Sequence, residues 1–590
     1  MWPAVDKVLY TSGRSLRLTM PLDLPDPLPA NLGDHVRAIY RAHFAHELAL
    51  GTVRPLVVPC GVLVTFGLPI LYFAIPHRNR PWLFRARYLL MLYILLYNVR
   101  ETFVTTSPNF ALGYAVGLMQ AWGIIWNMTL LVFMRPQFDA ERVERRPARP
   151  KVDAQVGMNR STNGHARISD AEENGLPVQD GHAHAVTRVN GGSKAPAQTP
   201  EPWEAEGGKV VDAPDEDVET SLAQGHEYYW QSYPEDSSFL ARLEWSYDLV
   251  TSFRGTGWNW SIPVVPRPSK PDKPHSGALV DLASMPVSTP QGYRRFTTRR
   301  GWLRRELLPS IAGCLALDAL SVVMMKDPYF ILGPEYTESA VPIPLPPLLA
   351  ALAPWQLFLY RSALSSGGVL AAISVMMKLW QLICAFTLRP LLGSRADLWH
   401  YPTLFGGFAH NVLDRGLAGF WGGYWHQTFR VAFGAPAAWL AGPGRRPNKT
   451  AAGFFAFAQS GLLHSLGSAS CLPPSRPWAP PVFFMLSWVG IMFQSTICGM
   501  PVVRGATRAL PRWASRAGNL AFVSVWLVAT QYWMLDDLAR SGIWLLEPVP
   551  VSLFRALGLG APGDHWWRWA WDELPRLHSG VHWWDIGIAL

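Results

Sequence analysis

The strongest constraint on this chain is a series of apolar runs, each near the roughly 20 residues that cross a bilayer as a helix. Seven have that length, and a shorter run at 88–99 makes eight. The long runs are 55–76, 110–134, 306–325, 363–388, 451–472, 481–500 and 518–538. Only 16% of the residues are charged, whereas soluble domains carry about 25%. The sequence therefore predicts an all-α polytopic membrane protein with about eight transmembrane helices.

Basic residues gather on one side of this predicted arrangement. Lys and Arg accumulate in the segments 77–87, 135–151, 294–305, 389–395 and 504–516. The loops at 100–109 and 473–480 are nearly free of them. Because Lys and Arg mark cytosolic loops, we expect the basic loops in the cytosol, both termini in the lumen, and the endoplasmic reticulum as the membrane. The net charge of +9 is then explained by the basic residues that set the orientation in the membrane, and no nucleic-acid partner is expected.

The chain divides into five predicted regions. These are a luminal segment 1–54, the first transmembrane helices 55–134, a cytosolic loop 135–300, a transmembrane core 301–540 and a luminal aromatic-rich segment 541–590.

The cytosolic loop is itself uneven in composition. Residues 139–226 are rich in Pro, Gly, Asn and charge, which predicts a disordered insert. The stretch 239–260 has helical periodicity followed by a Gly/Trp-rich turn, which predicts an amphipathic helix. Within the core, 429–442 is apolar but too short to span, and predicts a re-entrant or interfacial helix beside an internal chamber.

Metal and phosphate-loop signatures are missing from the sequence. The five cysteines are dispersed, with no CxxC or Cys/His ligand spacing. The segment 442–450, GPGRRPNKT, ends like a phosphate-binding loop, but Asn448 stands where that loop requires glycine. We therefore expect neither a metal nor a permanently bound cofactor.

Two histidines lie in apolar surroundings. His464 sits within a predicted span, and Ser460 lies four residues earlier on the same helical face. Ionisable residues inside a membrane are costly and usually functional, although a histidine bonded to a neighbouring helix is the simpler alternative. His426 lies in an aromatic segment, LAGFWGGYWHQTFR (417–430), which an interfacial aromatic girdle would also explain. A membrane transporter also fits such residues, but internal repeats typical of transporters are not seen.

Four sequence elements together carry a family resemblance. They occur in the order RGTGWNW (254–260), WHYPTLFGG (399–407), LAGFWGGYWHQTFR (417–430) and SGLLH (460–464). This series closely resembles the wax-synthase-like branch of the membrane-bound O-acyltransferases, similar to fungal O-acetyltransferases of secondary metabolism. One departure is that His400 and Tyr401 lie between Trp399 and Pro402.

The resemblance implies transfer of an acyl group from acyl-CoA to a hydroxyl of a hydrophobic alcohol inside a helical chamber. By this resemblance His464 is the general base and His426 the second polar residue of the site. The expected donor is acetyl-CoA and the expected acceptor a terpenoid or polyketide alcohol. A wax ester synthase using long-chain acyl-CoA and fatty alcohols is the alternative.

The neighbouring residues are assigned by their chemistry. An alcohol needs a base such as imidazole to become nucleophilic, and His426 or Gln427 would stabilise the oxyanion formed from the thioester. Arg430 is expected either to meet the phosphates of coenzyme A or to anchor the segment at the membrane interface. Trp421, Trp425 and Ser460 are expected to line the substrate chamber. Because no Ser or Cys stands beside a base, we expect direct transfer without an acyl-enzyme.

Overall fold

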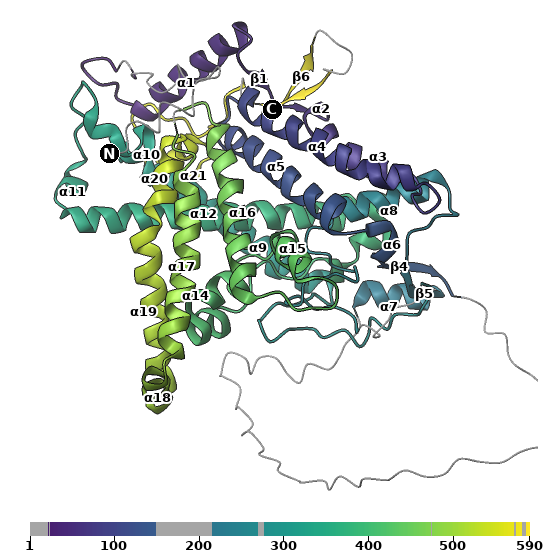
Figure 1. Ribbon diagram of the computed structural model, residues 1–590. Helices are drawn as coiled ribbons and strands as arrows, with labels where there is room; N and C mark the ends of the chain where they lie inside the picture. Colours follow the sequence, from purple (N-terminus) through teal and green to yellow (C-terminus); the bar gives the residue numbers. More distant parts are fainter. Residues whose placement is uncertain are drawn as a thin grey trace, which may run out of the picture. The chain divides into compact units, whose positions relative to one another are not determined.

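Helices dominate the computed structural model (Figure 1), which confirms the all-α class. The structure describes residues 22, 24–148, 215–269, 276–473, 475–571, 574–580 and 586–590. The helices up to the cytosolic loop are α1 (Leu32–Ala49), α2 (Cys60–Val62), α3 (Leu68–Phe73), α4 (Pro81–Val104), α5 (Phe110–Met128), α6 (Pro136–Asp139), α7 (Glu216–Ala223) and α8 (Phe239–Thr251). Those that follow are α9 (Arg299–Met324), α10 (Pro328–Leu332), α11 (Pro347–Ala350), α12 (Pro354–Leu382), α13 (Arg389–Leu392), α14 (Asp414–Gly419), α15 (Arg430–Ala441), α16 (Lys449–Ala469), α17 (Ala479–Gly499), α18 (Pro501–Ala509), α19 (Arg512–Thr530), α20 (Tyr532–Arg540) and α21 (Leu553–Ala556).

Short 3-10 and π-helical turns and small strands complete the described part. The turns are η1 (Leu63–Gly67), η2 (Thr129–Phe133), η3 (Pro334–Glu338), η4 (Ile383–Thr387), η5 (Gly393–Ala396), η6 (Leu398–His400), η7 (Ala409–Leu413), η8 (Phe420–Tyr424) and η9 (Ile543–Leu545). The strands are β1 (Arg54–Pro55), β2 (Val57–Val58), β3 (Thr105–Thr106), β4 (Arg142–Pro147), β5 (His226–Gln231), β6 (Arg576–Ser579) and β7 (Ile586–Ala589). β1 pairs with β3, β4 pairs with β5, and β7 lies between β2 and β6.

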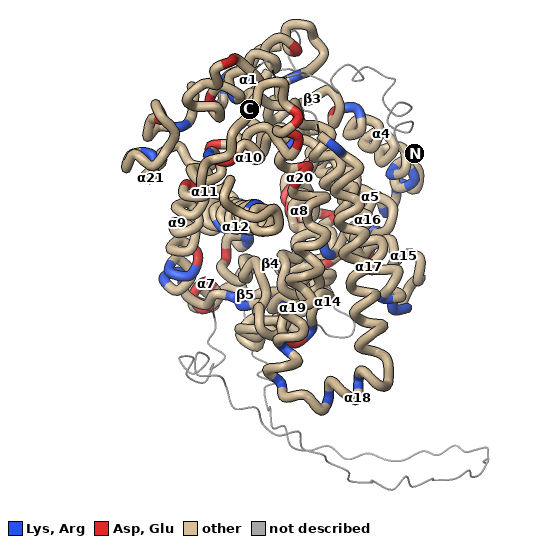
Figure 2. The backbone as a smooth tube through the Cα atoms, turned by 90° about the vertical axis from the view of Figure 1, so that its left-hand side faces the viewer, with Lys and Arg blue, Asp and Glu red and all other residues tan. Residues whose placement is uncertain are grey.

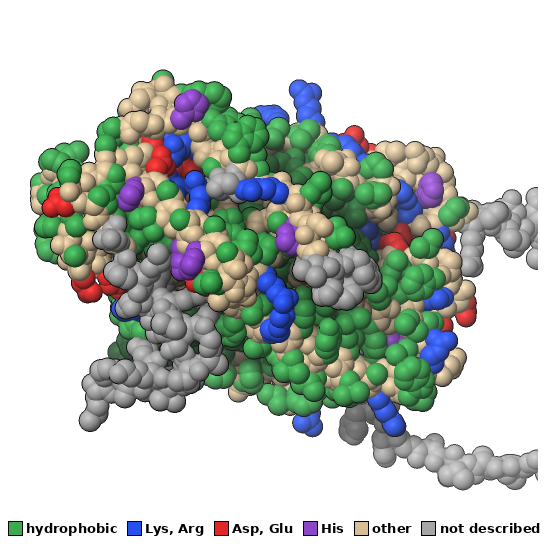
Figure 3. Space-filling model, turned by 90° about the horizontal axis from the view of Figure 1, so that it is seen from above, with side chains coloured by type: hydrophobic (Ala, Val, Ile, Leu, Met, Phe, Trp, Pro, Cys, Tyr) green, Lys and Arg blue, Asp and Glu red, His purple; other side chains and the backbone are tan. Residues whose placement is uncertain are grey.

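Four helices among the described residues are long and apolar enough to cross a membrane. They are Phe110–Phe133, Arg299–Met324, Pro354–Thr387 and Ala479–Gly499. The predicted count of eight spans is thus not confirmed, although these helices agree with an integral membrane protein. The short predicted span 88–99 lies inside the 24-residue α4, about 36 Å long. Its side chains include exposed Leu89, Leu92 and Leu96, and Figure 3 shows hydrophobic side chains over much of one face.

The predicted first span 55–76 is shorter than the sequence indicated. Its start forms β1 and β2, and the apolar helix covers only Leu63–Phe73. Proline lacks the amide hydrogen a helix needs and disfavours helical conformation in the preceding residue. Pro55 and Pro59 therefore account for the later start of the helix. The predicted span 518–538 is likewise divided between α19 and α20.

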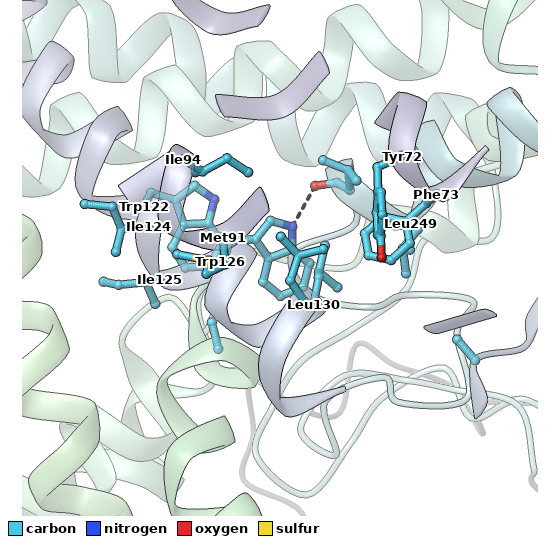
Figure 4. Packing of buried hydrophobic residues seen from close by; sticks show 14 of the residues in the cluster. Tyr72, Phe73, Met91, Ile94, Trp122, Ile124, Ile125, Trp126, Leu130 and Leu249 are labelled. Atoms are coloured by element: carbon cyan, nitrogen blue, oxygen red, sulfur yellow. Dashed lines mark hydrogen bonds between the residues drawn. The ribbon is translucent and has the colours of Figure 1, made fainter. Parts of the chain in front are cut away.

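A buried cluster joins the early transmembrane helices to α8 (Figure 4). Trp122 and Trp126 of α5 stack with ring centroids 5.5 Å apart. Trp126 also donates a hydrogen bond from Nε1 to the carbonyl of Val250 at 2.8 Å. Leu249 of α8 belongs to the same cluster. The cluster therefore fixes α8, which lies in the predicted cytosolic loop, against α5, one of the helices that hold the candidate site.

The cytosolic loop is more ordered at its edges than predicted. Residues 149–214 of the expected insert 139–226 lie outside the described residues, whereas its flanks form β4 and α7. Val143 and Val218 on these flanks are buried with Tyr228. The charged, proline-rich composition averaged over the whole stretch concealed these few apolar residues. The predicted helix 239–260 is also shorter: α8 ends at Thr251, before a turn in which Gly255 and Gly257 have positive φ.

Deletion of 149–214 through a flexible Gly-Ser linker should leave acyl transfer within about twofold of the full chain, since the described elements on both sides are retained. Deletion of 139–226 should abolish activity, because it removes β4 and α7 and leaves β5 without the strand that pairs with it. Initial rates in membranes with matched protein levels would check both. Loss of activity in the shorter deletion at normal expression would contradict the interpretation of this segment as dispensable.

Basic residues mark the helix that joins α17 to α19. Figure 2 shows Lys and Arg residues along α18, which carries Arg504 and Arg508. This helix falls in the loop 504–516 predicted to be cytosolic. The orientation itself stays a prediction.

Candidate active site

His464 lies where α16 meets α5 and α17. Tyr114 of α5 places its Oη 3.1 Å from Nδ1 of His464. Phe484 of α17 stacks on the imidazole, with ring centroids 5.1 Å apart and an interplanar angle of 17°. The ring lies deep in the protein but keeps part of its surface accessible. These contacts fix the orientation of the imidazole on two sides.

Glycines allow the helices around His464 to approach closely. A Cβ on Gly117 of α5 would lie 1.8 Å from the carbonyl oxygen of Leu466 on α16. Ser470 bridges the same contact, accepting from the Gly117 amide at 2.9 Å and donating to the Gly113 carbonyl at 2.7 Å. A Gly-x-x-x-Gly spacing commonly brings membrane helices together in this way. The GYAVG stretch of α5 is therefore what places Tyr114 next to His464.

His426 lies in the turn between η8 and α15. Its ring contacts Trp425 and Phe429, with centroids 5.3 and 5.7 Å away. Nδ1 of His426 is buried and has no hydrogen-bond partner among the described residues. Buried polar atoms nearly always have a partner, so an unpaired one requires an explanation.

An aromatic wall connects the two histidines. Trp425 contacts Trp421 at 5.9 Å, and Trp421 contacts Phe484 at 5.9 Å between ring centroids. Since Phe484 stacks on His464 and Trp425 contacts His426, the rings form a continuous path between the imidazoles. The two histidines are also near enough for their charges to interact. The aromatic rings of η8 and α17 thus link the two histidines.

Gln427 and Arg430 contact the backbone next to the site. The Gln427 amide donates to the carbonyls of Trp421 at 2.8 Å and Trp425 at 2.7 Å. Arg430 donates from Nη1 to the carbonyl of Gly422 and to Oε1 of Gln427, both at 2.8 Å. An amide nitrogen carries two hydrogens, and both are used here. Both N–H groups of Gln427 are therefore bonded to main-chain carbonyls, and neither is free to donate to an oxyanion.

Close backbone packing explains the glycine-rich block before His426. A Cβ on Gly419 would lie 1.7 Å from the carbonyl oxygen of Asn411, and one on Gly423 2.1 Å from its Oδ1. Asn411 is fully buried and donates to the carbonyls of Gln291 and Gly407, both at 2.8 Å. Only glycine permits this approach. The block thus holds η8, and through it Trp421 and Trp425, against η7.

Arg254 is a half-buried cation that the sequence analysis did not assign to the site. Its guanidinium donates to the carbonyls of Pro402 at 3.2 Å and Thr403 at 3.0 Å, and lies 5.5 Å from the centre of the Tyr293 ring. No carboxylate among the described residues pairs with it, and burial lowers the pKa of Arg254 to about 10. Arg254 lies near enough to His426 for its positive charge to act on that imidazole. The RGTGWNW motif was the signal that could have indicated it.

Ser460 lies one turn before His464 on α16 and is partly accessible.

A cleft of about 620 Å³ lies away from the candidate site, beside Arg78, Glu235 and Asn259, and neither histidine lines it. Within the described ranges, no group of three His, Cys, Asp or Glu side chains is placed to hold a metal ion.

Comparison with known proteins points to the same part of the chain, the segment that contains both histidines. Residues 401–486 match the model of the Membrane bound O-acyl transferase family. The chain is 25% identical over 368 residues to the acetyltransferase pyr8 of Aspergillus fumigatus, covering 60% of this chain and 75% of the relative. It is 27% identical over 256 residues to an acetyltransferase of Arthrobotrys oligospora, covering 40% of this chain and 43% of the relative. No solved structure shows a significant match. These similarities support a membrane O-acyltransferase resembling fungal acetyltransferases, as the motifs predicted.

Proposed function

Given that the chain resembles membrane-bound O-acyltransferases across its two-histidine segment, we propose that it transfers an acetyl group from acetyl-CoA to a hydroxyl of a hydrophobic alcohol, of the terpenoid or polyketide kind, in the endoplasmic reticulum membrane. One observation carries the proposal. Two deep imidazoles, His426 and His464, lie at one aromatic wall, and Nδ1 of His426 has no partner among the described residues.

In the proposed reaction His464 is the general base. Its free ring nitrogen removes the proton from the alcohol as the oxygen attacks the thioester carbonyl. The tetrahedral intermediate then collapses, the C–S bond breaks, and the coenzyme A thiolate takes the proton held by the imidazole. The products are the ester and free coenzyme A, so protons and electron pairs balance. Ser460, one turn away, borders the acceptor.

His426 is proposed to stabilise the oxyanion. With its proton on Nδ1, the neutral ring donates to the thioester oxygen as negative charge develops there. A donor of this kind contributes about 3 kcal/mol to the transition state. The unpaired state of Nδ1 supports this role, since the missing partner is the oxygen that forms during reaction. Trp421 and Trp425 would exclude water from the intermediate.

Arg254 and Arg430 are proposed to bind the phosphates of coenzyme A. Both guanidiniums lie next to Tyr293. Neither has a carboxylate partner among the described residues, and a buried charge without a counter-charge is costly. A phosphate group supplies that counter-charge, and the planar guanidinium matches its geometry. The two guanidiniums would then hold the phosphate end of the donor, and the pantetheine arm of acetyl-CoA would extend from there to bring the thioester to His426.

Arg254→Gln should raise the KM for acetyl-CoA by about tenfold with a smaller change in kcat, because ground-state binding of the donor is lost. Initial rates at varied donor concentration would check this. Arg446→Gln, which removes an exposed arginine, is the matched control and should behave like the wild type. An unchanged KM in Arg254→Gln would contradict the phosphate assignment.

The activity itself is tested with purified protein in nanodiscs. Radiolabelled acetyl-CoA and palmitoyl-CoA are each offered with terpenoid, polyketide and fatty alcohols. We expect an acetyl ester with a terpenoid or polyketide acceptor and little palmitoyl ester. Faster palmitoyl transfer to fatty alcohols would favour the wax ester synthase, and no transfer from either donor would overturn the proposal.

A further inference from the structure

We infer that Tyr114 is a positioning residue for His464, which holds the proton of the neutral imidazole on Nδ1 and so leaves Nε2 as the base. The inference rests on the proposed function, because it concerns how His464 acts in acyl transfer. Tyr114 is buried in α5, only 3% exposed, and no sequence motif marked it.

Counting hydrogens around the Tyr114 hydroxyl leads to this assignment. Oη lies 3.1 Å from Nδ1 of His464 and donates to the main-chain carbonyl of the same residue at 3.3 Å. A phenol has one proton. If that proton is given to the carbonyl, the contact with Nδ1 needs the proton of the imidazole. The pair of contacts is therefore complete only when Nδ1–H donates to Oη, and the lone pair then lies on Nε2.

The packing of α5 on α16 holds the Tyr114 hydroxyl against Nδ1 of His464. A Cβ on Gly467 would lie 2.8 Å from Cε1 of Tyr114, so the phenol ring rests directly on the α16 backbone. On the other side of His464, Phe484 stacks on the imidazole. The imidazole of His464 is held between Phe484 and the Tyr114 hydroxyl. This packing restricts rotation of the imidazole and movement of Tyr114 away from it. The geometry is set before substrate arrives.

The arrangement helps catalysis at two points. Before reaction it keeps the imidazole in the one tautomer that can accept the alcohol proton at Nε2. During reaction Nε2 gains that proton, and the hydrogen bond from Nδ1–H to Oη becomes charge-assisted and stronger. An interaction that strengthens in the transition state raises kcat and has little effect on substrate binding.

Tyr114→Phe should therefore lower kcat by about tenfold while the KM values for acetyl-CoA and for the alcohol change less than twofold. Tyr40→Phe is the matched control, since Tyr40 is also buried and its ring contacts Phe110 at the start of α5. Tyr40→Phe should keep the wild-type kcat. Donor binding to each variant, measured directly, shows whether the fold is retained.

A double mutant tests whether the loss of kcat in Tyr114→Phe arises through His464. In the His464→Ala background, Tyr114→Phe should cause no further loss, because a residue that acts only through His464 has nothing left to position. An unchanged kcat in Tyr114→Phe, a KM that rises as much as kcat falls, or loss of donor binding would each overturn the inference. If His464→Ala itself keeps full turnover, the general-base proposal fails instead, so the two failures are distinguishable.

Discussion

His464→Ala should lower turnover by about 100-fold or more while acyl-CoA still binds. The substitution removes the base that takes the alcohol proton, and a positioned base contributes about 10²–10⁴-fold. Donor binding should persist, because the base contacts the acceptor and Arg254 and Arg430 hold the donor. Single-turnover rates with labelled acetyl-CoA, together with donor binding, would measure the two effects separately.

The control for this variant lies on the same helix. Leu462 of α16 is 42% exposed and belongs to the outer surface, so Leu462→Ala should retain near-wild-type turnover. If His464→Ala also turns over at nearly the wild-type rate, His464 is not the base. The histidine would then be structural, and the transporter alternative would regain weight.

His426→Ala should also lower kcat by about 100-fold, through loss of the oxyanion donor. His426→Asn should recover part of this loss, for a geometric reason. The Nδ2 of asparagine occupies the same position along the side chain as the Nδ1 of histidine, which is the atom left unpaired in the structure. The recovery therefore tests the atom as well as the residue. Rates at saturating acetyl-CoA and alcohol would be compared for the three proteins.

The exposed His410 of η7 provides the control, and His410→Ala should leave kcat unchanged. Equal rates in His426→Ala and the wild type would remove His426 from the mechanism. A rescue by asparagine that is no better than alanine would place the donor function elsewhere than Nδ1.

The sequence determined the class of the protein and the residues around which the site is built. Long apolar runs with little charge require a helical membrane protein, because only satisfied backbones are tolerated in lipid. Histidine inside such a run is costly, so His464 could be selected as a candidate from one sequence, whereas His426 became a candidate through the resemblance of its motif to the O-acyltransferases. These signals are local in the chain, which is why they could be recognised without a structure.

The start, end and number of the membrane spans depended on single residues whose effect is lost when hydropathy is averaged over a window. Pro55 and Pro59 delay the first helix, and four helices of the described residues meet the length and hydropathy of a span. The edges of the predicted insert were also missed, since two valines in a charged stretch gain stability only by packing on distant partners such as Tyr228.

Only the tertiary structure decided which polar groups are free to act. Gln427 and His426 are adjacent in sequence and equally suited to donate to an oxyanion, yet Gln427 gives both of its N–H groups to main-chain carbonyls whereas His426 keeps Nδ1 unpaired. Tyr114 stands 350 residues from His464, and no local pattern connects them. A side chain's hydrogen bonds are set by whatever the packed helices bring within about 3 Å. The sequence alone therefore led to the proposal of two site histidines, and the packing of α5, α16 and α17 decided how His464 is held.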